Sequence, residues 1–333
     1  MDRSRNDPID DTARWAILSG SRFVLSCIVL VGHMSAFDPA GHSWTKIGVY
    51  LNQGSAVYGF LIISGYSIAA SLERGSTGFY GRRFWRIFPT YFASIVAACF
   101  VGALIGDGLQ TPSGFRFDPI SPYGVAIALF MLQSFVGPTI STDGQLWTIA
   151  VEWWNYIISP IFNKISSIFM AILMGVSLLF YCRWGNPENP ALSKYGHMFL
   201  TLSWYWIIGF IYYRHRRTPW GYAILFLPIM FVMNQAWVGR AAMIGIASVA
   251  LCDEIRIPGK WIAPLTWLGE LSYPVYAMHV PVIVLFVYLK IDQPSWAVAA
   301  TLVLSAVVLH SIDLPLRAWG YRLGKSRRRQ AIA

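Results

Sequence analysis

The chain has 333 residues, of which 56% are hydrophobic and only 13% are charged, whereas soluble proteins carry about 25% charged residues. This composition excludes a soluble globular protein, and the 15 Trp, 17 Tyr and 20 Phe exclude intrinsic disorder, because such a chain has ample apolar surface to bury. A net charge of +10 would suggest nucleic acid in a soluble protein, but here the basic residues cluster between apolar segments, as in membrane proteins. We therefore expect a lipid bilayer around the chain and no nucleic-acid partner.

Eleven long apolar segments follow one another along the chain. A spanning helix needs about 20 mostly apolar residues and a barrel strand about 10 alternating ones, so these continuous segments predict an all-α, polytopic transmembrane helical bundle. The first segment lacks the small-residue cleavage site of a signal peptide, and we expect it to remain as the first transmembrane helix. The segments are residues 15–37, 47–71, 84–106, 121–137, 146–162, 165–182, 197–213, 219–233, 237–252, 264–289 and 295–313.

Basic residues between the segments predict the orientation. They occur before Trp15, at 74–86, at 214–217, at 256–260 and from Arg317 onward, and the positive-inside rule places all five groups in the cytoplasm. An even number of crossings must separate two cytoplasmic loops, yet five apolar segments lie between residues 86 and 214, so one of them should not cross.

Segment 146–162 is the best candidate for this exception, because it mixes Glu152 and Asn155 with aromatic residues, and irregular structure at membrane depth needs protein or water around it. We expect about ten crossings plus one re-entrant or interfacial segment, with both termini cytoplasmic. Residues 1–14 are then a cytoplasmic segment, 15–317 the transmembrane domain and 318–333 a basic, solvated cytoplasmic tail.

Ionisable residues inside the first segment need an explanation, since charge is costly in lipid. Arg22 and His33 are eleven residues apart, which on a helix is within about 20° of three full turns and a rise of about 16 Å. Both side chains therefore share one face, with Arg22 toward the cytoplasm and His33 toward the outside. Each alone fits a simpler role, Arg22 snorkelling to the surface and His33 bonding to a neighbouring helix; together they fit a path across the membrane equally well.

The second and third segments each carry a further group of notable residues. The run Phe60–Ser67 contains small and hydroxyl residues that allow close helix packing and interhelical hydrogen bonds. Arg82, Arg83 and Arg86 follow at the cytoplasmic start of the third segment, where they could bind phosphate groups or only set the topology.

Three later segments also carry polar side chains. Glu152 shares a helical face with Gln145, Asn155 and Ser159, and a carboxylate among tryptophans must pair, protonate or face a polar cavity. Structural pairing with an arginine and a catalytic or positioning role are both open.

Tyr276 and His279 lie one turn apart between Pro274 and Pro281, which kink the helix and free backbone groups. His310 and Asp313 are expected to cap a helix end. The cysteines are expected to be small buried hydrophobes, and no CxxC pair suggests a metal site; they are Cys27, Cys99, Cys182 and Cys252.

Together these features resemble the acyltransferase-3 family of integral membrane acyltransferases from about Arg14 to Arg317. Five motifs in family order carry the resemblance. In addition, Asp313-x-Pro315 is similar to the acidic residue and proline with which the family's domain ends. The motifs are Arg22-x10-His33, the Phe60–Tyr66 run, Arg82-Arg83-x-x-Arg86-Ile87-x-Pro89, Leu146-Trp147-x4-Glu152 and Ser272-Tyr273-x-x-Tyr276-x-x-His279-x-Pro281.

The resemblance implies transfer of an acyl group, usually acetyl from acetyl-CoA, to a hydroxyl of a glycan, lipid-linked sugar or secondary metabolite. The expected partners are acyl-CoA and an envelope or exported glycan, in a bacterial inner membrane, with no permanently bound cofactor and no metal. Some relatives carry an extracytoplasmic hydrolase-like domain, which we do not expect here. The implied site comprises His33 and Glu152 as catalytic residues, Arg22, Arg82, Arg83 and Arg86 for the donor, and Ser64, Tyr66, Trp147, Asn155, Tyr276 and His279 for binding or positioning.

His33 suits the general base because imidazole titrates near neutral pH, and Glu152 could orient His33 or the acceptor. A covalent acyl-histidine relay is an alternative. The rival function is a proton-coupled transporter, in which the same residues form a path, although no duplicated half is visible. A regulatory membrane protein without catalysis is less favoured, because of the number of ionisable groups within the segments.

Overall fold

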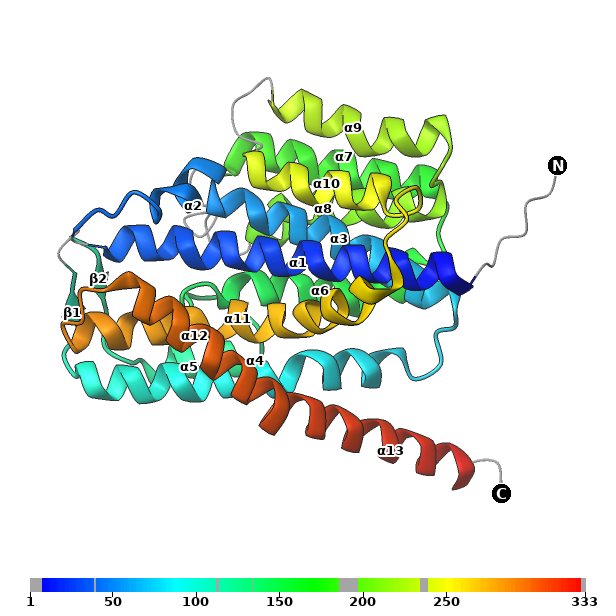
Figure 1. Cartoon of the computed structure of the whole chain (residues 1–333). Coiled ribbons are helices and arrows are strands. Elements are labelled where there is room, and N and C mark those ends of the chain that lie inside the picture. Colours follow the sequence, from blue (N-terminus) through cyan, green and yellow to red (C-terminus); the bar gives the residue numbers. More distant parts are fainter. Residues whose placement is uncertain are drawn as a thin grey trace.

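The computed structural model describes residues 8–38, 40–111, 114–133, 135–185, 197–233 and 239–330. These residues form a bundle in which most helices run along one common direction (Figure 1). The helices are α1 (Pro8–Phe37), α2 (Lys46–Leu51), α3 (Gln53–Glu73), α4 (Phe79–Ile105), α5 (Pro122–Leu129), α6 (Leu146–Phe162), α7 (Ser167–Trp184), α8 (His197–Arg214), α9 (Pro219–Met233), α10 (Arg240–Leu251), α11 (Ile262–Tyr288), α12 (Pro294–Val308) and α13 (Leu314–Gln330), with short helical turns η1 (Ser141–Asp143), η3 (Gly259–Trp261) and η4 (Leu309–Asp313).

The prediction of an all-α membrane protein is confirmed. Within the described residues, six helical stretches are long and apolar enough to cross a membrane, against the ten crossings expected from the sequence. They comprise α1, α3, α4, α7, α11 with η3, and the continuous stretch Pro294–Leu323. Two-residue strands β1 (Leu109–Gln110) and β2 (Arg116–Phe117) pair antiparallel after α4.

Helix ends mostly agree with the apolar segments, but segment 47–71 is divided in two. Asn52 lies between α2 and α3 with a φ of 61°, a left-handed conformation that Asn tolerates better than most residues. Its side-chain oxygen accepts a hydrogen bond from the Ser55 amide, which satisfies one of the free N–H groups at the start of α3.

The largest difference from the sequence prediction concerns segments 121–137 and 146–162. The first forms only the eight-residue helix α5, about 12 Å long and too short to cross, whereas the second forms the 17-residue α6 inside the bundle. The chain between them meets α11 at Tyr276 and Ala277, near the middle of that helix. Neither α5 nor α6 is among the six candidate spans, so the expectation that 146–162 does not cross stays a prediction, and α5 is a further helix too short to cross by itself.

The end of the last apolar segment also differs from the expectation. His310 and Asp313 do not cap a helix, because η4 is a π-helical turn that joins α12 directly to α13. Asp313 instead accepts a hydrogen bond from Arg317 within the continuing helix, and the helix runs through the expected tail boundary as far as Gln330.

Close packing explains the small residues of the Phe60–Ser67 run. A β-carbon at Gly65 on α3 would lie 1.9 Å from the Trp206 carbonyl oxygen on α8, and one at Gly209 would lie 2.0 Å from the Ile62 carbonyl oxygen. The two helix backbones are thus in direct contact, as the small residues predicted. The cysteine prediction holds for Cys252, which is buried, but not for Cys182, which is exposed.

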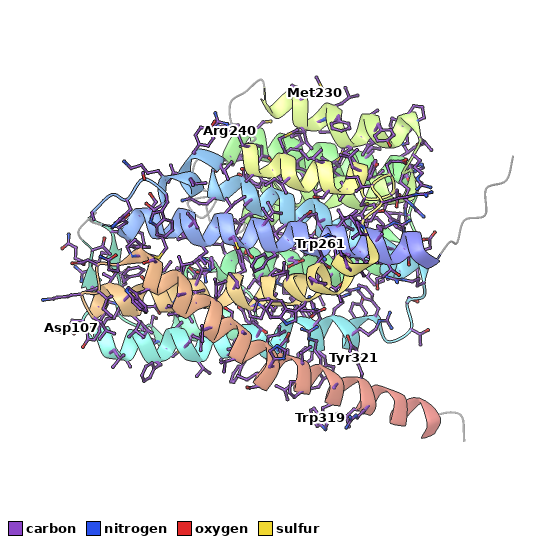
Figure 2. All side chains as sticks on the ribbon, viewed as in Figure 1. Asp107, Met230, Arg240, Trp261, Trp319 and Tyr321 are labelled. Carbon is purple, nitrogen blue, oxygen red and sulfur yellow. The ribbon has the colours of Figure 1, made fainter. Side chains whose placement is uncertain are left out.

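One end of the bundle gathers the basic loops. At the start of α1, Arg14 binds Asp253, which follows α10 and also attracts Arg216 after α8. In Figure 2, Asp107 and Arg240 lie toward the opposite end from the one at which α13 finishes, and Arg240 there donates to the Tyr50 carbonyl oxygen. We call the first end, with Arg14 and Asp253, the basic end.

Candidate active site

A cavity of about 290 Å³ opens among α1, α3, α4, α6 and α11. Its walls combine basic, acidic, hydroxyl and aromatic side chains, a mixture typical of a ligand site rather than of a packing defect, which would be apolar. The lining residues are Trp15, Arg22, Val57, Phe60, Leu61, Ser67, Arg74, Arg83, Arg86, Ile87, Thr148, Ile149, Glu152, Tyr156, Ser272, Tyr273 and Tyr276.

Arg22 and Arg83 in this cavity, like Arg74, form no salt bridge among the described residues. The Arg83 guanidinium lies over the rings of Phe79 and Tyr156, at 5.4 and 5.7 Å, and its buried Nε has no hydrogen-bond acceptor. Arg22 donates to the Ser67 hydroxyl at 2.5 Å, a neutral acceptor. Since a buried cation is costly without an anion, these side chains favour an anionic ligand.

Arg74 and Trp15 lie where the cavity approaches the basic end. The Arg74 guanidinium carbon is 5.3 Å from the centre of the Trp15 ring, a cation–π contact. Neither residue was singled out from the sequence, because an arginine at a helix C-terminus and a tryptophan at a membrane boundary have ordinary roles in topology.

Arg86 and Arg82 differ from Arg83, although the same motif contains all three. Arg86 is ion-paired with Glu270 on α11, and Glu270 also binds Arg317 at 2.6 Å. Arg82 donates to the carbonyl oxygens of Thr77 and Gly75 in the preceding loop and does not line the cavity.

Glu152 does line the cavity, on the side of α6. Its Oε1 accepts hydrogen bonds from the Ser64 hydroxyl, at 2.6 Å, and from the Tyr156 hydroxyl. Both partners fix the carboxylate between α3 and α6, and His33 is not among them.

His33 instead forms a hydrogen bond with His279. The other contact of His279 shows which of the two rings donates. The His279 Nδ1 lies 2.7 Å from the Tyr276 carbonyl oxygen, which can only accept, so Nδ1 carries the hydrogen. The His279 Nε2 of a neutral ring is then an acceptor and receives the bond from His33 Nδ1, 2.9 Å away. In the neutral pair the free lone pair is therefore on His33 Nε2.

Tyr276 connects the cavity to this histidine pair. Its ring lines the cavity and lies 5.8 Å from the His279 ring and 5.6 Å from the Phe60 ring. Its hydroxyl and that of Thr148 are 2.7 Å apart. The cavity thus ends one aromatic ring away from the histidines.

Besides Arg82, three residues of the implied site lie away from the cavity. Tyr66 is buried with its hydroxyl 3.6 Å from the Cys252 sulfur, Trp147 is buried in the apolar core, and Asn155 donates to the Val151 carbonyl oxygen of its own helix. None of them lines the cavity. Ser64 is one hydrogen bond away from the cavity, through Glu152.

The fold and this site define a membrane protein of the helical-bundle class with a basic cavity next to a histidine pair. A family model described as an acyltransferase domain matches residues 15–312. The chain therefore belongs to this acyltransferase family, which confirms the resemblance found in its motifs.

Curated relatives are distant but cover much of the chain. The peptidoglycan O-acetyltransferase OatA of Listeria monocytogenes is 24% identical over 91% of this chain and 56% of its own length. A Bacillus subtilis protein named "Putative peptidoglycan O-acetyltransferase YrhL" is 25% identical over 79% of this chain and 50% of its own. The chain thus spans about half the length of these two relatives.

A third relative is closer in size. The protein of Acidianus two-tailed virus named "Putative acetyltransferase ORF330" is 24% identical over 74% of both chains. No solved structure gives a significant match.

Proposed function

We propose that the protein is a membrane-embedded O-acyltransferase that moves an acyl group from acyl-CoA to a hydroxyl of an envelope or exported glycan. The acyl group we propose is acetyl. The observation that carries this proposal is the cavity that contains Arg22 and Arg83, neither in a salt bridge among the described residues, and that ends at the ring of Tyr276 beside His279. Family membership favours an enzyme over a transporter built from the same ionisable groups.

The donor binds through its phosphates. Arg22 and Arg83 supply positive charge and form no salt bridge with a carboxylate in the part of the chain that the structure describes, and guanidinium groups bind phosphate through paired N–H donors. Trp15 and Arg74, toward the basic end, then meet the nucleotide part, because aromatic faces stack on bases. The narrow pantetheine arm occupies the cavity, with its thioester toward Tyr276.

His33 acts as the general base. The lone pair on Nε2 accepts the proton of the acceptor hydroxyl as its oxygen attacks the thioester carbonyl. The carbon–sulfur bond then breaks, the acyl group stays on the acceptor oxygen, and the CoA thiolate takes the proton back from the imidazolium. His279 supports the positive charge on His33 by accepting its Nδ1 hydrogen bond.

Glu152 serves the donor rather than His33 in this proposal. Its carboxylate is held by Ser64 and Tyr156 in the cavity wall, where it can accept from the amide groups of the pantetheine arm. This assigns Glu152 a binding role instead of the orienting role expected from the sequence.

The acceptor approaches from the end opposite the donor. We propose that the basic end is cytoplasmic, as the positive-inside rule implies, with both termini there and the whole protein in the bacterial inner membrane. Ten passes are retained if α5 and α6 together make one interrupted crossing, α8 makes another, and the shorter helices α9 and α10 also cross. The names of two relatives mention peptidoglycan, which supports a glycan acceptor.

Reconstitution with radiolabelled acetyl-CoA tests the proposal. The purified protein in lipid vesicles should transfer label to cell-envelope glycan, and the label should be released by mild base, as expected for an ester. A His33→Ala variant should bind acetyl-CoA but not transfer it. Transport of an intact solute without any labelled ester would support the transporter and contradict the proposal.

A further inference from the structure

Helix α11 has a backbone carbonyl that its own helix cannot satisfy. Pro281 lies inside α11 and has no N–H group, so the carbonyl oxygen four residues earlier, on Ala277, has no intrahelical donor. This carbonyl is adjacent to Tyr276, whose own carbonyl accepts from His279. A buried acceptor without a partner is costly, so the donor that replaces the missing N–H is structurally important.

Gln145 supplies that donor. Its side-chain nitrogen lies 3.1 Å from the Ala277 carbonyl oxygen and 3.5 Å from that of Tyr276, and it also binds Asp143 Oδ1. The two N–H groups of the amide are thus divided between Asp143 and α11. Asp143 is fully buried and Gln145 nearly so, with 0% and 4% of their surfaces exposed.

Asp143 fixes which end of the Gln145 amide faces α11. Because the Asp143 oxygen accepts the hydrogen bond, the amide nitrogen, not the amide oxygen, is directed toward the carbonyls. Both residues lie at the irregular backbone between α5 and α6, and η1 contacts α11 there. The interruption of the helical structure thus delivers two polar side chains to the bend of α11.

We propose that Asp143 and Gln145 are positioning residues of the histidine pair. They hold the carbonyls of Tyr276 and Ala277 at the bend made by Pro281, and so keep His279 hydrogenated on Nδ1 and the His33 lone pair on Nε2. The effect on catalysis rests on the proposed function, whereas the effect on the histidine tautomers does not.

Nuclear magnetic resonance of protein labelled with ¹⁵N-histidine in lipid nanodiscs tests the positioning without any turnover. The wild type should show His33 and His279 each hydrogenated on Nδ1. In Gln145→Met, His279 should lose this single tautomer and show a mixture. A wild-type spectrum in folded Gln145→Met would overturn the proposal.

Gln133 offers a matched control. It is also a fully buried glutamine whose side-chain nitrogen donates to a backbone carbonyl, that of Leu146 at 3.1 Å, and to the Tyr91 hydroxyl at 2.8 Å. Gln133→Met removes comparable hydrogen bonds without touching α11, so it should leave both histidine signals unchanged. If Gln133→Met and Gln145→Met changed the histidine signals equally, the cause would be a general loss of packing, which would contradict the proposal.

Pro281→Ala provides the second arm of the test, because alanine at position 281 supplies the backbone N–H that can donate to the Ala277 carbonyl oxygen. The double variant Pro281→Ala with Gln145→Met should therefore keep the histidine tautomers of Pro281→Ala alone, even if Gln145→Met by itself does not fold. If Gln145→Met disturbs the pair to the same extent in both backgrounds, the freed carbonyl is not the link and the proposal fails.

Kinetics complete the test where acetyl transfer is measurable. Loss of a group that orients a metal-binding histidine costs about 10-fold to 100-fold. We expect a similar factor here, so Gln145→Met should lower kcat by about 10-fold to 100-fold while the KM for acetyl-CoA stays within about twofold. Changed tautomers in a protein that transfers no acetyl group at all would contradict the proposed function and leave the positioning role standing. An unchanged kcat with folded protein would contradict the positioning role.

Discussion

The cavity and the histidine pair are neighbours with opposite physical character. The cavity is hollow and holds the guanidinium groups of Arg22 and Arg83, which form no salt bridge with any described carboxylate. The histidine pair is joined by hydrogen bonds within the protein. The Tyr276 carbonyl oxygen accepts from His279, and His279 accepts from His33. One region lacks a partner that a ligand can supply, while the other is already ordered before any ligand arrives.

This difference separates binding from chemistry. Charge that is unpaired in the free protein contributes to ligand affinity, whereas a pre-oriented lone pair lowers the barrier of the reacting step. Substitutions in the cavity should therefore raise the KM for the donor, and substitutions in the histidine pair should lower kcat. A variant in either region that changed both constants equally would contradict this comparison.

The largest effect is expected for His33→Ala. Removal of a general base costs about 10²-fold to 10⁴-fold, and we expect kcat to fall by about 10³-fold, while acetyl-CoA affinity, measured by equilibrium binding, stays near that of the wild type. Acetyl transfer at a near wild-type rate by the purified variant would exclude His33 as the base.

Arg83→Ala should show the opposite signature. A charge-assisted hydrogen bond from arginine to phosphate is worth about 1.5–3 kcal/mol, so the KM for acetyl-CoA should rise about tenfold or more with a smaller change in kcat. Initial rates over a range of acetyl-CoA concentrations measure both constants. A normal KM combined with a low yield of folded protein would indicate that Arg83 only sets the topology.

Glu270→Ala should lower stability by a smaller free energy. Glu270 binds both Arg86 and Arg317 but is 33% exposed, so solvent screens part of the interaction and we expect a loss of about 1–2 kcal/mol. Thermal unfolding in detergent, followed by tryptophan fluorescence, should show the lower Tm.

Glu254→Ala is the control for that measurement. The pair of Glu254 with Arg217 is 59% and 53% exposed, and such surface pairs contribute at most about 1 kcal/mol. Equal Tm changes in Glu254→Ala and Glu270→Ala would mean that the Glu270 network is no more than a surface ion pair.

The smallest effect is expected for Arg82→Ala. Its guanidinium caps loop carbonyls outside the cavity, so the KM for acetyl-CoA should change by less than about threefold, roughly 0.6 kcal/mol. The same titration as for Arg83→Ala checks it, and a tenfold rise would place Arg82 at the donor after all.

The sequence predicted the helices well because apolar length and loop charge are local properties. It missed the interruption between α5 and α6, since segment 121–137 is as apolar as a crossing segment and only its tertiary contacts show that the helix stops at Leu129. The polar residues of 146–162 agree with the protein surroundings expected for them, since Glu152 and Asn155 both form hydrogen bonds with protein groups.

The site was predictable in composition but not in pairing. Helical spacing related Arg22 to His33, yet no local pattern shows that His33 meets His279, 246 positions away. Likewise the Arg82–Arg86 motif gives three similar cations, and only the neighbouring helices distinguish Arg83 over two aromatic rings from Arg86 on Glu270. Asp143 had no recognisable motif, because its role depends on a proline in another helix.

The π-helical turn η4 also sets the rotational phase of α13. A π-helical turn contains one residue more than an α-helical turn, and each residue of an α-helix corresponds to about 100° of rotation. If the five residues Leu309–Asp313 were wound as α-helix instead, α13 would be turned by about that angle, and Trp319 and Gly320 would leave the Trp85 ring against which they pack. The π-helical winding of this turn thus decides which face of α13 meets α4.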